Sequence, residues 1–312
     1  MARRKRYKKI DPAVVLVILI IILIVYIVMI YFESQNNGES TQDSHAPASS
    51  SLTVSSGELG NVEYHFIDVG QGDATLIRTP EGDILIDTGE NSAEEDLKNY
   101  LDLCGVDDLY YAVFTHPDSD HIGGADMILA EYEVLNVIKP DFEKTTKVYT
   151  RMMEAIEAEG CTVYNALPGE TYSLGEFDMF VLGPDPENNE LDSNNSSIVI
   201  KATWGNTTAM LTGDAEKPAE ESILRTFSAA ELGSMLLKMG HHGSKTSSTD
   251  AWLAAVNPKI AIISCGLNNS YGHPHAEALA RITPYVGESI YRTDLLGTIV
   301  FVTDGESFTY QD

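Results

Sequence analysis

The chain contains few basic residues for its length. Its 312 residues include 20 Lys and Arg against 47 Asp and Glu, which gives a formal net charge of −27 at pH 7. Six of the basic residues precede residue 10, so residues 33–312 carry 14 Lys and Arg against 46 Asp and Glu, a net charge of −32. A domain with this charge has no general attraction for polyanions, which argues against a tight, non-specific nucleic-acid-binding protein.

Cysteine is also scarce. Cys104, Cys161 and Cys265 are an odd number and lack the spacing of metal ligands, so the sequence contains neither a disulfide framework nor a cysteine zinc site. Each lies among apolar residues, and we expect buried free thiols, although an exported domain can hold one disulfide. The chain also lacks a repeat of fixed short period, which argues against a repeat architecture.

One long apolar run is present near the N-terminus. Residues 13–32 contain no charge, Gly or Pro, and at about 1.5 Å per residue a helix of this length spans the roughly 30 Å of a bilayer's hydrocarbon. The run is longer than the apolar part of a usual signal peptide, and no small-x-small cleavage site follows it closely. The sequence therefore predicts a single transmembrane anchor.

The distribution of Lys and Arg predicts the orientation of this anchor. After the run, the first basic residue is Arg78. Before it, residues 1–12 contain Arg3, Arg4, Lys5, Arg6, Lys8 and Lys9. Because positive charge stays in the cytoplasm, we expect a cytoplasmic N-terminus and a C-terminal domain outside the cell, held at the cell membrane by one N-terminal helix.

The composition changes twice after the apolar run. Residues 33–60 are rich in Ser, Asn, Gly and Thr, which predicts a flexible linker. In residues 61–312, strand-rich hairpins are followed by alternating helix and strand patterns, so we expect one α/β domain with two sheets covered by helices. The expected strands are 62–69, 74–79, 83–87, 109–115, 134–138, 161–165, 177–182, 197–204, 207–212, 234–239 and 260–265, followed by a last hairpin that closes at Tyr310. The expected helices are 93–104, 125–132, 144–159, 218–227, 250–256 and 276–283.

The strongest chemical signal is the run THPDSDHIGG at residues 115–124. A loop that leaves a strand end can turn several side chains toward one point, and two metal ions about 3.5–4 Å apart need such a density of imidazole and carboxylate. The alternative is a polar surface loop in which an Asp caps the next helix. The run places four candidate metal ligands within six residues: His116, Asp118, Asp120 and His121.

Histidine is concentrated at the ends of strand patterns. His45 lies in the linker and His65 inside a strand, where we expect no function. Asp214 follows another strand pattern, where its two carboxylate oxygens can bridge two metal ions, although an N-cap is the simpler explanation of such an Asp taken alone. The remaining six histidines lie in three short segments after strands: His116, His121, His241, His242, His273 and His275.

Together these segments resemble the metallo-β-lactamase superfamily and, more narrowly, the soluble C-terminal domain of ComEC-type competence proteins. The resemblance covers about 250 residues, and the combination of motifs is specific although each motif alone is not. The matching segments are FIDVGQGDA (66–74), IDTG (86–89), HPDSDHIGG (116–124), LTGDAE (211–216), GHHGS (240–244) and YGHPH (271–275).

The resemblance implies a metallo-β-lactamase-like αβ/βα sandwich with two divalent metal ions, Zn or Mn, at the seam between its sheets. The implied bridge is Asp214, and His275 is a reserve ligand two residues from another candidate. The other implied ligands are His116 and Asp118 for one ion, and Asp120, His121 and His273 for the second.

Three departures from the superfamily's pattern affect these expectations. Asp118 stands where the pattern H-x-H-x-D-H has its second His; ComEC-type domains share this change, and an added carboxylate favours manganese more than an all-His site does. No His lies between His121 and Asp214, where another ligand is usual. ComEC-type proteins carry a multi-helix membrane channel, so with one span we do not expect this chain to be a DNA channel.

The pair His241 and His242 is expected to supply the missing imidazole. If the strand geometry persists, adjacent residues point to opposite sides, so we expect one ring to enter the metal site and the other to face the substrate or to pack behind the site. The free ring, or a metal-bound carboxylate such as Asp214, could then act as the general acid. The alternative is that both rings brace the turn at 240–243, in which case the missing ligand is water or a side chain such as Asn195.

Polar residues in the matching motifs are expected around the ligands. Carboxylates can hydrogen-bond ligand imidazoles from behind, and an aspartic-protease interpretation of residues 87–89 fails because it needs a second copy of the motif. Ser244 and Lys245 follow a Gly-rich turn, where they could contact a phosphate or serve only as a helix cap and a solvated cation. The residues expected to support the site are Asp68, Gln71, Asp73 and Asp87.

These features predict an extracytoplasmic, metal-dependent phosphodiesterase or nuclease anchored in the membrane, with nucleic acid as the leading substrate. A cell-wall phosphodiester or another anionic ester is the competing substrate class, because the acidic surface does not suit tight DNA binding. A metal-stabilised binding module without catalysis is the competing kind of function. The sequence indicates no protein partner.

Overall fold

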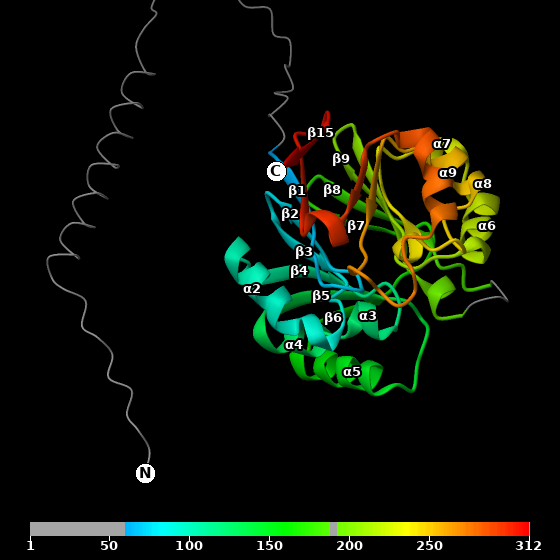
Figure 1. Cartoon of the computed structure of the whole chain (residues 1–312). Helices are drawn as coiled ribbons and strands as arrows, with labels where there is room; N and C mark the ends of the chain where they lie inside the picture. Colours follow the sequence, from blue (N-terminus) through cyan, green and yellow to red (C-terminus); the bar gives the residue numbers. More distant parts are fainter. Residues whose placement is uncertain (1–59, 188–191, 312) are drawn as a thin grey trace, which may run out of the picture. The chain divides into compact units, whose positions relative to one another are not determined.

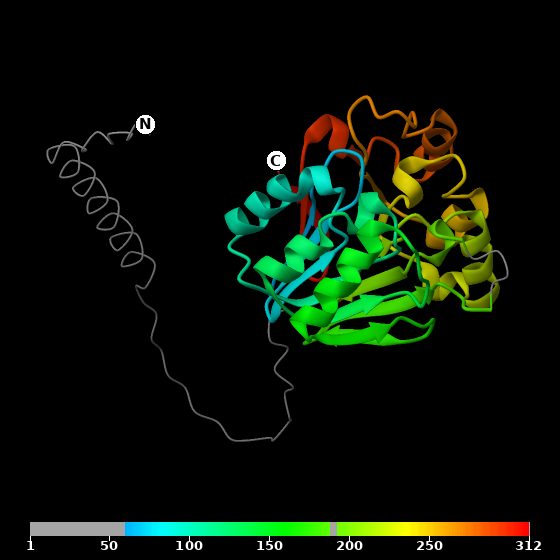
Figure 2. The same cartoon turned by 90° about the horizontal axis from the view of Figure 1, so that it is seen from below.

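The computed structural model describes residues 60–187 and 192–311, which form two twisted sheets packed face to face. Helices cover the outer face of each sheet, so the order of layers is helix, sheet, sheet, helix (Figures 1 and 2). This αβ/βα sandwich confirms the predicted fold. The predicted anchor and most of the linker lie outside the described residues, and no helix within them is long and apolar enough to cross a membrane.

The first sheet contains the N-terminal strands and the last two strands of the chain. Its strand order is β15-β14-β1-β2-β3-β4-β5-β6. The hairpin strands pair antiparallel, whereas β3 to β6 are parallel and connected through helices. The bounds are β1 Val62–Phe66, β2 Thr75–Thr79, β3 Gly82–Ile86, β4 Asp108–Val113, β5 Glu133–Lys139, β6 Thr162–Asn165, β14 Ile299–Thr303 and β15 Phe308–Gln311.

The second sheet contains the middle of the chain, in the order β13-β12-β11-β10-β9-β8-β7. Strands β10 to β13 are parallel, so their carboxyl ends lie at one edge of the sheet. The bounds are β7 Thr171–Leu174, β8 Phe177–Gly183, β9 Val199–Trp204, β10 Thr207–Leu211, β11 Leu236–Lys238, β12 Ile260–Ile263 and β13 Ile290–Arg292.

Apolar residues fill three layers between these elements. The inner layer joins the two sheets through side chains such as Phe66 and Phe177, both fully buried. The two outer layers hold the helices against the sheets. The first sheet is covered by α2 Glu94–Cys104, α3 Ser119–Ile122, α4 Ala125–Glu131 and α5 Lys147–Glu159, and the second by α6 Lys217–Thr226, α7 Ala229–Leu232, α8 Asp250–Val256 and α9 Ala276–Val286.

Most expected elements are present, with a few differences in detail. Helix α5 begins at Lys147 rather than at 144, because the Thr146 hydroxyl accepts a hydrogen bond from the Tyr149 amide and caps the helix there. Strands β7 and β13 and the short helices α3, α7 and α10, the last at Thr293–Leu296, were not expected. The three cysteines are free thiols as predicted, but only Cys265 is buried; Cys104 and Cys161 are partly exposed.

Candidate metal centre

The expected ligands meet where strand ends of the two sheets face each other. The run 116–121 follows β4 of the first sheet, and Asp214 follows β10 of the second. His241 and His242 follow the neighbouring parallel strand β11. Because carboxyl ends of parallel strands lie at the same edge of a sheet, segments far apart in sequence bring their polar side chains to one place.

Asp214 lies at the centre of this cluster and is buried. Its Oδ1 is 3.2 Å from Nε2 of His121, and its Oδ2 is 3.3 Å from Nε2 of His242. Nε2 of His116 is 3.9 Å from Oδ2. Both carboxylate oxygens are therefore surrounded by imidazole nitrogens, as a bridging carboxylate would be.

Several polar atoms of the cluster lack hydrogen-bond partners within the described residues. They are Nε2 of His116, His121 and His242, together with Oδ1 of Asp214. A buried polar atom without a partner costs about 1–3 kcal/mol. Four such atoms that converge on one point are explained by a cation, since lone pairs of nitrogen and oxygen are what a divalent metal ion binds. The residues present therefore fit a metal site.

The charges of the cluster agree with a cation. Burial raises the pKa of Asp214, but His242 and His121 outweigh burial, and the pKa of Asp214 lies well below its usual value. Burial lowers the pKa of His242, but Asp214 and Asp73 raise it more, and its pKa lies well above its usual value. The carboxylates thus attract positive charge, which either protons on the rings or metal ions can supply.

Two partners behind the rings fix the nitrogens that face the cluster. Oδ2 of Asp87 is 2.8 Å from Nδ1 of His121, and Nδ1 of His242 donates to the carbonyl of Ser264 at 2.9 Å. Asp87 also accepts hydrogen bonds from the amide and the hydroxyl of Thr115. With Nδ1 protonated in each ring, Nε2 presents its lone pair to the cluster.

Asp73 belongs to the same group but lies on the other side of the rings. Asp73, His121, Asp214 and His242 offer ligand atoms within 4.8 Å of one another. However, Oδ1 of Asp73 faces Nδ1 of His242 at 3.5 Å, and its carboxylate forms a buried ion pair with Lys238 of β11. We therefore assign Asp73 to the support of the rings, since the ammonium already satisfies its charge.

The two carboxylates of the run 116–121 lie at the rim of the cluster. Oδ2 of Asp120 is 3.3 Å from Nε2 of His242, and Oδ2 of Asp118 is 4.0 Å from Nε2 of His116. Asp118 also forms an ion pair with Lys144 and accepts a hydrogen bond from Ser193. Each of these two carboxylates therefore lies beside a different imidazole.

A glycine allows the motif loops to pack this closely. Gly72, at φ +150°, lies against the carbonyl of Asp120, and a Cβ atom at this position would approach that oxygen to 2.4 Å. The amide of Asp73 donates to the same carbonyl at 3.1 Å. The loop after β1 thus holds the run 116–121 in place through backbone contacts.

The predicted alternation of His241 and His242 is wrong. Both residues have positive φ, 49° and 54°, within the turn 240–243, so the strand geometry has already ended. Both rings consequently approach Asp214, with Nε2 of His241 3.8 Å from its Oδ2. The rings still differ in burial, since the side chain of His242 is 1% exposed and that of His241 is 23% exposed.

Glu216 orients the more exposed ring. Its Oε1 lies 2.9 Å from Nδ1 of His241 and accepts a hydrogen bond from the hydroxyl of Thr246 at 2.6 Å. The bond to His241 lowers the pKa of Glu216, which keeps the carboxylate ionised. Nδ1 of His241 is thereby fixed as a donor, and Nε2 points toward Asp214.

A cavity of about 140 Å³ opens above these residues. Gln71 takes part as expected: its Oε1 accepts a hydrogen bond from the amide of Gly266, and its buried Nε2 has no hydrogen-bond partner within the described residues. His273 lies in the wall of the cavity, and burial lowers its pKa to about 4. The cavity is lined by Gln71, Asp118, Asp120, Asn194, Asp214, His241, His242, Tyr271 and His273.

Some expected site residues lie elsewhere. Asp68 is exposed and accepts a hydrogen bond only from the amide of Gly70, so it does not support an imidazole. Nδ1 of His275 accepts from the amide of Lys245, and the hydroxyl of Ser244 pairs with Thr246. Asn195, the reserve for the missing ligand, caps α6 by accepting from the amides of Glu216 and Ala219. Local loop geometry explains each of these positions.

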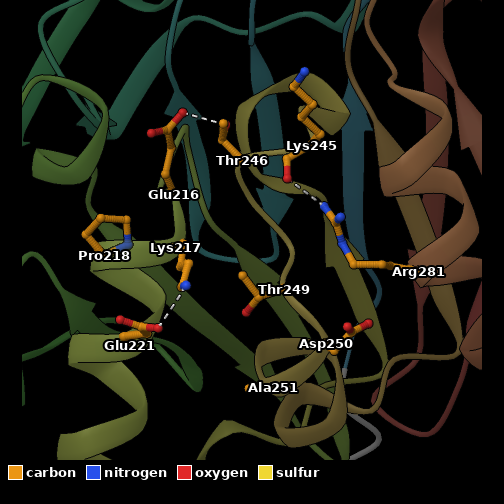
Figure 3. Close-up of a pocket in the computed structure, with 10 residues that line it drawn as sticks. All are labelled: Glu216, Lys217, Pro218, Glu221, Lys245, Thr246, Thr249, Asp250, Ala251 and Arg281. Carbon is orange, nitrogen blue, oxygen red and sulfur yellow. Dashed lines mark hydrogen bonds and ion pairs between the residues drawn. The ribbon is translucent and has the colours of Figure 1, made fainter.

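Lys245 lines a larger pocket of about 570 Å³ next to the cluster (Figure 3). The pocket shares the Glu216–Thr246 hydrogen bond with the site. Its other cations are engaged: Lys217 lies 3.6 Å from Glu221, and Arg281 donates to the carbonyls of Lys245, Ser247 and Ser248. The lining combines three basic side chains with three acidic ones, Glu216, Glu221 and Asp250, so the pocket carries no excess of positive charge.

Four residues of the site were not expected from the sequence. Glu216, Asn194 and Tyr271 line the two cavities, and Lys238 is buried behind Asp73. The signal for Lys238 was present, since a Lys inside the apolar strand segment LLKM needs a buried anion. Nothing in the local sequence distinguished Glu216 from a solvated carboxylate.

The comparison with known proteins agrees with this geometry. The sequence profile of the metallo-beta-lactamase superfamily matches residues 67–267, and the chain belongs to that superfamily. The fold is also that of the metallo-beta-lactamase fold protein YhfI from Bacillus subtilis, with a TM-score of 0.54 and 10% identity over 78% of this chain and all of that one.

Within the superfamily, the chain is similar to ComEC-type competence proteins. It is 31% identical over 257 residues to ComE operon protein 3 of Bacillus subtilis, which covers 77% of this chain and 33% of that protein. It is 34% identical over 224 residues to Recombination protein 2 of Haemophilus influenzae, which covers 70% of this chain and 26% of that protein. The chain thus spans about a third or less of the length of these relatives.

Proposed function

We propose that this chain is a metal-dependent phosphodiesterase that acts on nucleic acid outside the cell. The observation that carries the proposal is the convergence of unpartnered Nε2 atoms on the two oxygens of Asp214. A cluster of this kind is expected in a member of the metallo-beta-lactamase superfamily, to which the chain belongs. The names of the similar proteins, which refer to competence and recombination, favour nucleic acid over other phosphodiesters.

We propose a distribution of ligands that follows the observed distances. One cation would be held by His116, Asp118 and Asp214, and a second by Asp120, His121, His242 and Asp214. His242 takes the position that the sequence had suggested for His273, because its buried Nε2 faces both Asp214 and Asp120. Zn and Mn both suit imidazole and carboxylate ligands, and the carboxylates favour Mn.

Bound divalent cations would supply a nucleophile by lowering the pKa of water to about 7 and would neutralise charge on phosphate oxygens. Side chains of the protein would bind the phosphate and supply a proton. Gln71 and Asn194 carry amide groups at the cavity, where they can donate to phosphate oxygens. His241 is held by Glu216 with Nε2 toward the cavity, and in its imidazolium form, with both ring nitrogens protonated, it can give the Nε2 proton to the leaving oxygen.

The test is a screen of the purified full chain with Mn²⁺ and Zn²⁺. The substrates are bis-p-nitrophenyl phosphate, single-stranded DNA, double-stranded DNA and a β-lactam. We expect hydrolysis of the phosphodiesters, and loss of that activity in Asp214→Asn but not in Asp107→Ala, which removes an exposed carboxylate at the end of β4 opposite to the run 116–121. Stoichiometric metal without any hydrolysis would instead favour a binding module, and preference for the β-lactam would contradict the proposed substrate class.

The same screen, extended by one substrate, tests a second substrate class. The net charge of −32 over residues 33–312 opposes tight binding of a polyanion, which favours a smaller phosphodiester of the cell wall. Hydrolysis of bis-p-nitrophenyl phosphate together with a short glycerol phosphodiester, but not of DNA, would support that class.

We also propose the membrane topology that the sequence predicts, with residues 13–32 as the anchor and the hydrolase domain outside the cell. Protease added to intact cells should then degrade the C-terminal domain. Complete protection of this domain until the cells are lysed would place it in the cytoplasm.

A further inference from the structure

The loop between β12 and α9 presents an exposed aromatic ring at the mouth of the cavity. Tyr271 is 63% exposed, although it lines the same cavity as Asp214 and His241. Its ring lies nearly parallel to that of His273, with 5.6 Å between centroids and an interplanar angle of 20°. One ring face is thus covered by a wall of the site, and the side chain makes no contribution to the buried core.

The same loop is held in one conformation by Asn269. Its Oδ1 accepts hydrogen bonds from the amides of Tyr271 and His273, at 3.2 and 2.9 Å. Its Nδ2 donates to the carbonyls of Gly266 and His273. Four hydrogen bonds to one side chain fix the backbone on both sides of Tyr271, so little conformational entropy is lost when a ligand packs on the ring.

The charge of the domain limits the ways in which a nucleic acid could be bound. Arg and Lys contacts to phosphates supply most of the affinity in basic proteins, but here the net charge is −32 over residues 33–312. The neighbouring pocket does not change this, since its lining contains as many acidic as basic side chains (Figure 3). Stacking of bases on aromatic rings is the other general source of affinity for single strands and needs no basic residue.

We infer that Tyr271 is a stacking platform for the nucleobase next to the scissile phosphodiester, which makes the substrate a single-stranded or locally unpaired nucleic acid. This inference rests on the proposed phosphodiesterase activity. A base can stack on the ring only when it is unstacked from a duplex, because both faces of a paired base are already covered by its neighbours. Tyr271 would therefore determine specificity, while the cluster around Asp214 performs the reaction.

The test compares two oligomers that differ only in their bases. The first is hexathymidylate, and the second is a chain of equal length with abasic tetrahydrofuran units. With the Mn²⁺-loaded full chain, Tyr271→Ala should raise KM for hexathymidylate about 10-fold or more, with little change in kcat. KM for the abasic chain should not change, and Tyr271→Phe should stay within about 2-fold of the wild type. Hexauridylate should behave like hexathymidylate, because stacking does not distinguish the sugars.

The matched control is Leu103→Ala, which truncates a side chain 82% exposed on α2 and should alter neither KM. An equal loss on both oligomers in Tyr271→Ala would mean that the residue only supports the loop, and no loss on either would mean that it is an ordinary surface residue. Equal KM values of the wild type for the two oligomers would also overturn the inference.

A binding measurement separates this inference from the proposed activity. If the wild type cleaves neither oligomer, the proposed function fails, and fluorescence anisotropy with phosphorothioate hexathymidylate then tests the platform alone. Binding that prefers bases and weakens about 10-fold in Tyr271→Ala would support the platform without catalysis. Binding that is absent or independent of Tyr271 would overturn it.

Discussion

The two sheets contribute to the metal centre in different ways. The first sheet supplies four candidate ligands from one loop, residues 116–121, which follows β4. The second sheet supplies Asp214, His241, His242 and the wall residue His273 from the ends of three different strands. The candidate ligands of the first sheet are close together in the sequence and can be recognised there as a motif. Those of the second sheet come together only when β10, β11 and β12 pair.

The comparison also shows where the two sheets depend on each other. The ion pair between Asp73, from the loop after β1, and Lys238, from β11, joins them behind the ligands. Asp214 stands between His121 of the first sheet and His242 of the second. The site is therefore an interface between two halves, and variants on either side test how strongly each half needs the other.

The largest effect is expected from Asp214→Ala, because this carboxylate faces rings from both sheets. The variant should lose both metal ions, and turnover should fall on the order of 10³-fold or more. Metal content by mass spectrometry of the protein and rates with bis-p-nitrophenyl phosphate check this, with Asp107→Ala as the control. Two metal ions retained per chain would remove Asp214 from the bridging position.

Lys238→Met should give the next largest effect, because it leaves the buried carboxylate of Asp73 without its ammonium. Burial raises the pKa of Asp73, but Lys238 and His242 outweigh burial and hold its pKa well below the usual value. Loss of one partner of a buried ion pair costs about 3–5 kcal/mol of unfolding free energy. Urea unfolding of the metal-free protein measures this cost.

The double variant Lys238→Met, Asp73→Asn sharpens the same measurement. It removes both charges, so it should recover part of the lost stability if the cost comes from an unpaired carboxylate. A single variant within about 1 kcal/mol of the wild type, or a double variant that is less stable than either single one, would argue that the pair does not hold the sheets together.

His241→Ala and His242→Ala should separate two roles within the second sheet. The buried ring of His242 faces Asp214 and Asp120, so its loss should lower metal affinity. The ring of His241 is held by Glu216, so its loss should leave the metal bound and lower kcat on the order of 10²-fold. Glu216→Gln should lower kcat less, because the ring keeps a hydrogen-bond partner.

The pH profile provides a second readout for this pair. If His241 gives a proton to the leaving oxygen, kcat in the wild type should fall at high pH, and this limb should be absent in His241→Ala. Full metal content and full activity in both His variants would instead show that the two rings only brace the turn 240–243.

The smallest effect concerns a carboxylate of the second sheet's helical layer, Glu220. It accepts hydrogen bonds from the amides of Ser248 and Thr249 and from the Thr249 hydroxyl, yet burial raises its pKa to about 7. The folded state therefore binds more protons than the unfolded state between about pH 4.5 and 7. Unfolding free energy should decrease on the order of 3 kcal/mol as pH rises through this window.

Glu220→Gln should remove this pH dependence, whereas Glu221→Gln, at an exposed neighbouring position, should keep it. Urea midpoints measured at pH 5, 6, 7 and 8 for the three proteins make the comparison. An identical slope in Glu220→Gln would assign the pH dependence to another group.

The fold and the first sheet's contribution were predictable from the sequence for a physical reason. The strands and helices carry distinct hydrophobic periods, and the run 116–121 is held together by covalent neighbours. The family resemblance is confirmed by the superfamily match over residues 67–267. The candidate oxygen ligand Asp214 was predicted because it follows an apolar strand.

The second sheet's contribution was predicted less well because turns decide it. His241 and His242 were expected to alternate as in a strand, but both adopt positive φ, which only the packing of the turn 240–243 imposes. Asp68 and Asp73 belong to the same motif and are five residues apart. Asp68 is nevertheless exposed to solvent, whereas Asp73 is buried behind the ring of His121. Pairings such as Glu216 with His241 join residues that no local pattern connects.

The charge of the cavity depends on whether metal ions occupy the site, because three carboxylates lie there. Asp118, Asp120 and Asp214 line it, while Asp73 is neutralised by Lys238. Two divalent ions would turn the combined charge of the three carboxylates from −3 to +1, on top of the charge of Lys144, which pairs with Asp118. An acidic protein would then attract an anionic substrate more strongly once it had been loaded with metal. Encounter with the substrate, and not only its turnover, would depend on the supply of metal.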